Sequence, residues 1–575
     1  MDAVSADSVT DSIEIAEEYP APSPGTWTPE PIHFGRPHSV FAAVDFFKAT
    51  EIGMARSLER YGGPIENVEF KLSNRIAFMC VRPVGAPPDA DKLPPKWLFK
   101  LIQTVHPKIG KWRRRANRAY RDKSWRPHIA WWDNEEKPWS IARAGELREV
   151  DPGTLNDEDL ITHLTECKAF FLRTAETHHV LNMSFMLPLG DFLNQAKGWT
   201  DLSTSELLGL FEGYSGASKG AVVQLEQLRA ALDNDAEMAA LVRSDIAPSK
   251  ILATLGGGRG AVATALKAYL DYDGYRTVTG YDVADMMFIE SPEVVIRVIR
   301  SVIENTGDRD TTPGGDRWTD GIREKVPPKH RLQFDELLAE ARSVFRIREE
   351  RGAMADALST GLTRRAILEA GRRLEKQGKV LAADQLVDAT LDEIAALIRG
   401  SDSPSAVEIK LRADFRINHD FSDVPKYLGS KPIEPPPADW FPKSARRAQQ
   451  AFQKIFSLML NGGKSVSDET VIRGLPVYPG VYEGTARVVA DMFDMEKIED
   501  GDILVSRMTA PSFNAIFPML GAVVTDQGGL LCHAAITARE FAIPAVIGCE
   551  DATTLIADGM RLHVDGALGE VRIIG

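Results

Sequence analysis

The sequence has little cysteine and no long apolar run. Its four cysteines, Cys80, Cys167, Cys532 and Cys549, are scattered along 575 residues, without disulfide density or metal-ligand spacing. No apolar stretch approaches the ~18 residues that a membrane span requires, and the N-terminus is acidic where a secretory signal would be basic. We therefore expect a cytoplasmic protein without a membrane segment and without a metal site of its own.

Basic residues are scarcer than acidic residues in this chain. The chain has 68 lysines and arginines against 82 aspartates and glutamates, a net charge of -14. This acidic balance argues against a nucleic-acid-binding protein. Residues 1–28 contain no lysine or arginine and include Pro20, Pro22 and Pro24, so we expect a flexible acidic tail there.

One local stretch is an exception to the acidic balance. Residues 108–126 form the most basic stretch of the chain and are interleaved with aromatic residues. Basic and aromatic residues together can bind nucleic acid. Because the spacing is helical and the chain is acidic, a solvated face or a surface for an acidic partner is the better interpretation.

The length predicts three or four structural units, because one core does not serve 575 residues. Residues 29–400 are expected to form a largely α-helical domain, to which the family resemblance described below assigns acceptor binding. Two strand-like runs near its start, at 68–72 and 76–81, predict a small β element. The proline-rich residues 401–465 are expected to be an extended connector followed by a linker helix. Residues 466–575 are expected to form an α/β domain, which the resemblance described below identifies as a carrier.

The stretch around His533 carries the chemistry. Residues 521–525 have the composition of a β-strand, Gly528 and Gly529 then release the backbone, and a helix is predicted from Ala534. His533 is thus expected at an exposed strand-loop-helix junction. Amides at a helix N-terminus favour a phosphate group and disfavour a charged imidazole, so the ring can stay neutral and nucleophilic.

Helical spacing places two further polar residues beside this histidine. Thr537 and Glu540 follow His533 by four and seven positions and share its face of the predicted helix. Arg539 lies on another face, so we do not expect it to contact a phosphate on His533.

The C-terminal hundred residues resemble a known family. The resemblance is to the swivelling phosphohistidine domain of phosphoenolpyruvate (PEP) synthase and pyruvate phosphate dikinase. It implies that His533 accepts a phosphoryl group at one site and carries it to a second, with Thr525, Gly528 and Gly529 around the phosphate. Leu531 replaces a threonine of the PEP synthases, which is more similar to rifampicin phosphotransferase and the aryl-phosphate synthases. The matching residues are Gly480, Gly484, 486–488, 501–505, Thr525, 528–529, 533–535, 538–540, 543–546 and Gly548.

The middle of the chain also resembles the acceptor-binding segment of rifampicin phosphotransferase and phenylphosphate synthase. The likeness rests on residues 275–276, 281–283, 292–293, 346–350, 371–374 and 378. Within it, Arg276 and Arg348 are candidates to bind phosphate, although such arginines often only pin helices together. His178 is a candidate to accept a proton from a substrate hydroxyl; the alternative is a structural or surface histidine.

The nucleotide site of such enzymes is not recognisable in the sequence. Gly256–Gly260 follows a helix-like stretch and lacks the Gly-Lys-Ser/Thr ending of a phosphate loop. The chain also ends soon after His533, without the pyruvate-binding barrel of PEP synthase. We therefore expect ATP and Mg²⁺ to be bound by a separate ATP-grasp subunit.

These features predict the acceptor-binding and phosphohistidine subunit of a heteromeric, dikinase-type aryl-phosphate synthase in aromatic compound catabolism. The resemblance implies transfer of a phosphoryl group from ATP through phospho-His533 to a phenol or cresol hydroxyl, leaving AMP and phosphate. The alternatives are the same carrier mechanism with another acceptor, such as a rifampicin-like antibiotic, a sugar or pyruvate, a non-enzymatic phosphorelay module, or a degenerate scaffold. The sequence does not identify the base that activates the acceptor.

Overall fold

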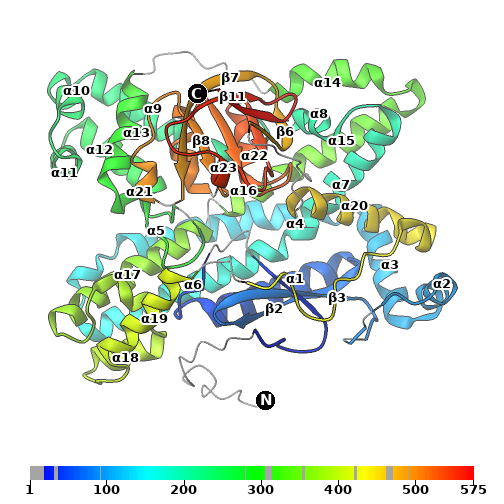
Figure 1. The fold of residues 1–575 in the computed structure, drawn as a ribbon, viewed down its shortest axis with the longest axis horizontal. Coiled ribbons are helices and arrows are strands. Elements are labelled where there is room, and N and C mark those ends of the chain that lie inside the picture. Colours follow the sequence, from blue (N-terminus) through cyan, green and yellow to red (C-terminus); the bar gives the residue numbers. More distant parts are fainter. Residues whose placement is uncertain are drawn as a thin grey trace.

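The computed structural model describes residues 19–30, 36–87, 89–90, 92–278, 280–304, 314–352, 356–419, 424–460, 470–490, 492–509 and 511–574. Most of this chain is helical, with a small sheet near the N-terminus and a larger sheet near the C-terminus, which confirms the expected fold class (Figure 1). Among the described residues, no helix combines the length and apolar composition that a membrane crossing requires.

The N-terminal sheet contains the predicted hairpin. Its strand order is β2-β3-β1-β4, and β2 and β3 are joined by a tight turn at Asn74 and Arg75, both with positive φ. Helix α1 (Ala43–Tyr61) packs against β2 on one side and α6 on the other. The strands are β1 (Thr26–Pro29), β2 (Ile65–Ser73), β3 (Ile76–Pro83) and β4 (Leu428–Gly429).

The segment expected to be an extended connector is partly folded, so that prediction is wrong for its first half. Residues 406–418 form helix α19 (Ala406–Asn418), which starts with a capping box between Ser405 and Glu408 and buries Ile409 and Ala413 one turn apart. The two-residue strand β4 then pairs with β1. Local capping and an apolar i,i+4 pair outweigh the proline content around them. The glycine pair Gly462-Gly463 predicts a break after the linker helix, but these residues lie outside the part of the chain that the structure describes.

The remaining helices form a lower layer and two upper groups (Figure 1). The lower layer holds α2 (Lys96–Val105), α3 (Pro107–Arg121), α4 (Trp125–Trp131), α5 (Lys137–Glu149), α6 (Asp157–Val180), α17 (Ala357–Lys376), α18 (Leu391–Ile398) and α19. Helix α7 (Asn182–Trp199) lies between this layer and the upper helices on the right of the view. One upper group holds α9 (Val222–Asp233), α10 (Ala236–Arg243), α11 (Pro248–Gly257), α12 (Ala261–Tyr269) and α13 (Pro292–Glu304). The other holds α8 (Thr204–Leu208), α14 (Gly314–Lys325) and α15 (Arg331–Phe345), while α16 (Ile347–Arg351) and α20 (Lys443–Leu460) lie between the layers.

The C-terminal domain sits between the two upper groups and above the lower layer (Figure 1). Its sheet has the order β5-β12-β11-β7-β8-β9-β10-β6, in which β7, β8, β9 and β10 run parallel. Its strands are β5 (Val471–Arg473), β6 (Leu475–Tyr478), β7 (Val481–Val489), β8 (Ile503–Ser506), β9 (Ala522–Thr525), β10 (Ala545–Ile547), β11 (Arg561–Asp565) and β12 (Glu570–Ile573). Its helices are α21 (Met492–Met495), α22 (His533–Glu540) and α23 (Ala552–Leu555).

One buried apolar cluster joins this domain to the helices. It runs from Phe211 and Phe345 of the helical region to Phe517, Leu531 and Ala534 of the C-terminal domain. A second cluster, around Ile503, Val524 and Val564, belongs to the C-terminal sheet alone. The domain thus has a core of its own and is docked through a continuous apolar contact.

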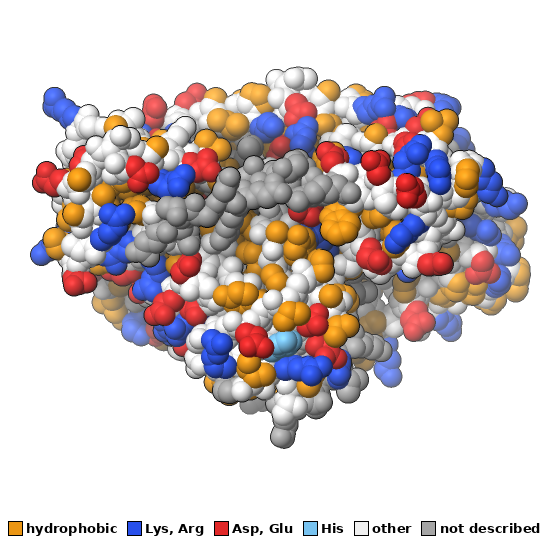
Figure 2. Space-filling model, turned by 90° about the horizontal axis from the view of Figure 1, so that it is seen from above, with side chains coloured by type: hydrophobic (Ala, Val, Ile, Leu, Met, Phe, Trp, Pro, Cys, Tyr) orange, Lys and Arg blue, Asp and Glu red, His pale blue; other side chains and the backbone are white. Residues whose placement is uncertain are grey.

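The surface charge follows the mixed composition. Acidic and basic side chains are interspersed on the face seen from above (Figure 2). Within residues 108–126, Lys108 pairs with Glu66 and Arg115 with Glu59. Part of the basic stretch is therefore already neutralised by acidic residues of the same chain.

Candidate functional site

His533 is the first residue of helix α22 and follows the loop that leaves strand β9. In this loop Gly528 has a φ of +117°, and a Cβ there would lie 2.7 Å from the sulfur of Cys532. Only glycine fits such a position without strain. The loop geometry therefore places His533 at the helix N-terminus, where backbone amides favour an anion.

Both nitrogens of the His533 ring are in contact with polar side chains. Nδ1 lies 2.8 Å from Oγ1 of Thr509, and Nε2 lies 3.0 Å from Oδ1 of Asn514. Thr537, which the helical spacing placed on the same face, has its Oγ1 3.2 Å from Nε2. The residue is only 7% exposed, which corrects the expectation of an exposed junction. It is buried because the C-terminal domain is docked on the helical region.

The environment keeps this ring neutral. Burial, followed by the positive charge of Arg348, lowers the pKa of His533 from 6.5 to about 3. An imidazole with this pKa is uncharged at neutral pH and retains a nucleophilic lone pair. The sequence predicted a neutral ring from the helix terminus, whereas in the structure burial is the larger cause.

His533 lies at the edge of a cavity of about 210 Å³. The cavity is walled by helices α1, α6, α7 and α20 and by the faces of β2 and β3. Its apolar lining consists of Phe46, Phe47, Met54, Leu58, Ile65, Val68, Phe70, Met79, Phe171, Ala175, Met183, Met186, Phe452, Phe456 and Met459. Such walls exclude water, which would otherwise compete for a phosphoryl group.

Beside His533 the cavity wall carries charged residues from helix α16. Oε2 of Glu349 lies 3.9 Å from Nε2 of His533, and burial raises the pKa of this carboxyl. Nε of Arg348 is buried without a hydrogen-bond partner among the described residues, and Oε1 of Glu349 lies 3.6 Å from it. A guanidinium in this position is suited to an anion near His533.

A histidine and an aspartate pair in the same cavity. Nδ1 of His178, on α6, is hydrogen-bonded to Oδ2 of Asp356, the residue before α17. Arg351 donates to the backbone carbonyl of His178 and, over 2.6 Å, to Oδ1 of Asn182. This guanidinium is buried, and burial lowers its pKa to about 9.

The residues proposed from the sequence fall into two groups. Arg348 and His178 line the cavity, together with His533. Arg276 is not among its lining residues: its Nη1 lies 2.6 Å from Oδ1 of Asp273, and its guanidinium covers the ring of Tyr272. The structure therefore places Arg276 as a pin between local elements, which was the alternative interpretation.

The three residues expected around the phosphate shape the loop. Oγ1 of Thr525 donates over 2.9 Å to the carbonyl of Gln527, and the carbonyl of Gly529 accepts over 2.8 Å from the amide of Cys532. Together with the positive φ of Gly528, these bonds fix the path from β9 to His533. A direct phosphate contact by any of them stays a prediction.

Sequence reasoning missed Thr509, Asn514, Glu349 and Asp356. Thr509 follows strand β8, which is parallel to β9. Because the carboxyl ends of neighbouring parallel strands meet at one sheet edge, this was a usable signal. Asn514 lies in a short helical turn and Asp356 in a distant segment, and neither carries a local signal.

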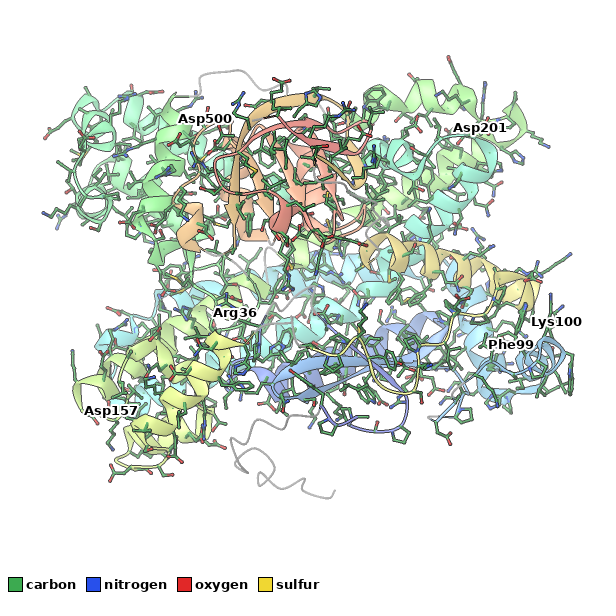
Figure 3. The ribbon with its side chains drawn as sticks, viewed as in Figure 1. Arg36, Phe99, Lys100, Asp157, Asp201 and Asp500 are labelled. Atoms are coloured by element: carbon green, nitrogen blue, oxygen red, sulfur yellow. The ribbon has the colours of Figure 1, made fainter. Side chains whose placement is uncertain are left out.

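Several contacts hold the C-terminal domain over the cavity. Oε1 of Glu540 accepts from the amides of Gly213, over 3.0 Å, and Ser215, over 3.1 Å. The amide of Leu531 donates to the carbonyl of Leu458 on α20. At the opposite edge, Asp500, labelled in Figure 3, accepts from Ser301 of α13 over 3.3 Å. Most of these bonds pair a side chain with a partner that water can also satisfy.

The fold and the position of His533 agree with the family comparison. Residues 498–569 match the mobile domain of PEP-utilising enzymes, so the segment that carries His533 is a domain of this kind. Residues 217–367 match the fourth domain of rifampicin phosphotransferase. The resemblances to the mobile domain of PEP-utilising enzymes and to rifampicin phosphotransferase are thereby confirmed.

Individual relatives match either about half of the chain or a stretch of about a hundred residues. A rifampicin phosphotransferase from a Streptomyces species is 30% identical over 334 residues, which is 54% of this chain and 34% of the relative. The rifampicin phosphotransferase of Bacillus subtilis is 49% identical over 102 residues, 18% of this chain and 12% of the relative. The phosphoenolpyruvate synthase of Aeropyrum pernix is 46% identical over 104 residues, 18% and 13% respectively. This chain thus spans about a third or less of each of these relatives.

Proposed function

We propose that this protein is a phosphotransferase in which His533 carries a phosphoryl group to the hydroxyl of a small phenolic acceptor such as phenol or cresol. The observation that carries the proposal is the position of a neutral, buried histidine at the edge of an apolar cavity. The matches to the mobile domain and to phosphotransferases support the carrier role.

The size and lining of the cavity favour a single-ring acceptor. An apolar protein cavity of ~150 Å³ can hold benzene. The cavity here is of about 210 Å³ and is rich in phenylalanine and methionine. Rifampicin is a macrocycle far larger than this space, so an antibiotic acceptor would require the cavity to open. The rifampicin phosphotransferase matches nevertheless make that acceptor the second candidate.

In the proposed reaction Nε2 of His533 forms the bond to phosphorus. This nitrogen lies on the side of Glu349 and the cavity. In the structure Nε2 faces Oδ1 of Asn514, which only accepts, so Nε2 carries the ring proton in this arrangement. For Nε2 to attack phosphorus, Asn514 must turn aside and the ring proton must be held on Nδ1, which can donate to Oγ1 of Thr509. Arg348 then neutralises charge on the transferred group, and the apolar walls exclude water.

We propose that an ATP-grasp partner binds ATP and Mg²⁺ and phosphorylates His533, leaving AMP and phosphate. No step at the acceptor site depends on the identity of that partner.

The acceptor half-reaction can be tested with this chain alone. A phosphohistidine carrier exchanges labelled phenol into phenyl phosphate without nucleotide, because the same phosphoenzyme forms and decays in both directions. We expect such exchange for phenol and cresol. We also expect the phosphoenzyme formed from ³²P-labelled phenyl phosphate to be trapped by quenching the reaction, and mass spectrometry to identify His533 as the modified residue.

Two variants provide the comparison. His533→Ala should abolish exchange. His563→Ala should retain it, because His563 lies on β11 of the same domain, pairs with Glu483 and is absent from the cavity lining. Phenol exchange that survives His533→Ala would overturn the carrier role of His533, and transfer to rifampicin or pyruvate but to no phenol would overturn the phenolic assignment.

A further inference from the structure

The proposed reaction needs a group that removes the acceptor proton. A phenol has a pKa near ~10, so at neutral pH it enters the cavity with its proton in place. Apart from His533 and the two arginines, the titratable side chains of the lining are Glu30, His178, His179, Tyr281, Glu349 and Asp356. The following inference rests on the proposed function and assigns one of them.

Two of these groups are poorly placed to act as the base. Glu349 stands 3.9 Å from Nε2 of His533, on the donor side of the transfer, and is paired with Arg348. In an in-line displacement the acceptor oxygen approaches from the side opposite the leaving nitrogen. Tyr281 is buried, and burial raises the pKa of its hydroxyl, so it remains protonated.

The hydrogen bonds of the two histidines give them opposite tautomers. Oδ1 of Asn182 accepts from Arg351, so the amide nitrogen of Asn182 is the atom that faces Nδ1 of His179, 3.2 Å away. Nδ1 of His179 is then an acceptor, and the proton of a neutral ring sits on Nε2. That nitrogen donates and cannot take up a proton.

His178 has the reverse arrangement. Its Nδ1 faces a carboxylate oxygen of Asp356, which only accepts, so the ring proton sits on Nδ1 and Nε2 keeps a lone pair. Arg351 holds the backbone carbonyl of the same residue. A histidine oriented by a carboxylate in this way is the arrangement that serves general bases in other enzymes.

We propose that His178 is the general base that deprotonates the phenolic acceptor and that Asp356 is the positioning residue that fixes its tautomer. The phenolic proton moves to Nε2 of His178, and the oxygen lone pair forms the new O–P bond. The N–P bond of phospho-His533 breaks, and its electron pair returns to Nε2 of that ring. The products are the aryl phosphate, neutral His533 and protonated His178, so charge and atoms balance.

The test varies the acidity of the phenol in the exchange assay with the full chain. At pH 8, 4-nitrophenol is largely ionised and needs no base, whereas phenol and cresol do. His178→Gln should slow exchange of phenol by about 100-fold or more, the usual size of general base catalysis. It should leave exchange of 4-nitrophenol within a few-fold of the wild type, which also shows that the variant is folded.

Two further variants separate the roles. Asp356→Asn should slow phenol exchange and change its pH profile, because the amide no longer fixes the tautomer of His178. His179→Gln, a neighbouring change in the same wall, should keep the wild-type dependence on phenol acidity even if binding weakens. For wild-type protein the rate of phenol exchange should fall on the acidic side of the pH profile, where His178 becomes protonated. In His178→Gln this acidic limb should be absent.

The outcomes are distinguishable. Equal slowing of all phenols by His178→Gln, or the same selective slowing of phenol relative to 4-nitrophenol in His179→Gln, would overturn the assignment of the base while leaving the phenolic acceptor in place. Wild-type protein that exchanges no phenol, although His533 becomes labelled from a nucleotide-binding partner, would instead overturn the proposed function and this inference with it.

Discussion

Glu540 offers the sharpest test of how the carrier domain is held over the cavity. It ends helix α22 of the mobile domain, and its Oε1 accepts from the amides of Gly213 and Ser215 in the helical region. The residue is 9% exposed. Replacement by alanine removes both bonds and leaves two amides without their partner whenever the domain is docked.

The expected size follows from the two bonds. A hydrogen bond to a charged group contributes ~1.5–3 kcal/mol. Since both bonds share one oxygen, we take the lower value for each, which gives about 3 kcal/mol in favour of the docked state. A difference of this size corresponds to roughly a hundredfold in the ratio of docked to undocked molecules.

Amide hydrogen exchange measures this ratio directly. In Glu540→Ala, peptides that contain Gly213 and Ser215 should lose about a hundredfold of protection, whereas those from strand β9 should exchange as in the wild type. Glu483→Gln is the matched control, because it removes a carboxylate from the same domain where the partner is His563 of that domain. Unchanged protection at 213 and 215 in Glu540→Ala would refute the reasoning.

Three further predictions concern His533, its loop and the cavity. The pKa of His533 is about 3 against 6.5 for an exposed histidine, so only the unfolded ring gains a proton as the pH falls below 6.5. The free energy of unfolding of the wild type, measured in urea, should therefore fall by up to ~1.4 kcal/mol per pH unit down to pH 3, more steeply than that of His533→Asn. Equal pH slopes for the two proteins would contradict this. Gly528→Ala should cost ~1–3 kcal/mol in thermal unfolding and slow labelling of His533, whereas Gly559→Ala, with φ +86° but open space around it, should slow no labelling. Met54→Trp should fill part of the cavity and raise KM for phenol exchange at least tenfold; an unchanged KM would place the acceptor elsewhere.

The sequence predicted those features that depend on neighbouring residues. Strand β9, helix α22 and the β2–β3 hairpin appear where hydrophobic periodicity and turn residues placed them. The contact between Thr537 and His533 followed from helical spacing alone. These elements are encoded locally, so a single chain suffices to find them.

Features that depend on which surfaces meet could not be predicted. Helical periodicity in the sequence predicts one helical stretch over residues 203–234. In the structure residues 209–221 interrupt it, and this interruption supplies the amides that hold Glu540. The pairing of His178 with Asp356 joins positions 178 residues apart. Burial of His533 likewise follows from docking and not from its own neighbours in the chain.

The contacts of His533 also indicate which state of the carrier this arrangement fits. Nε2 lies 3.0 Å from Asn514 and 3.2 Å from Thr537, and Nδ1 lies 2.8 Å from Thr509. A hydrogen bond of this length leaves no space for a phosphorus atom on either nitrogen. Phosphorylation therefore requires one of these side chains to move.

Asn514 is the side chain that separates the ring from the helical region. Its amide nitrogen reaches the carbonyl of Ala217 at 3.5 Å, the limit of a hydrogen bond, and a Cβ on Gly220 would lie only 3.0 Å from its own Cβ. Under the proposed function, we expect the loaded carrier to dock with Asn514 turned aside, so that its amide and the hydroxyl of Thr537 can donate to the phosphoryl oxygens. The closed contact seen here fits an unphosphorylated ring.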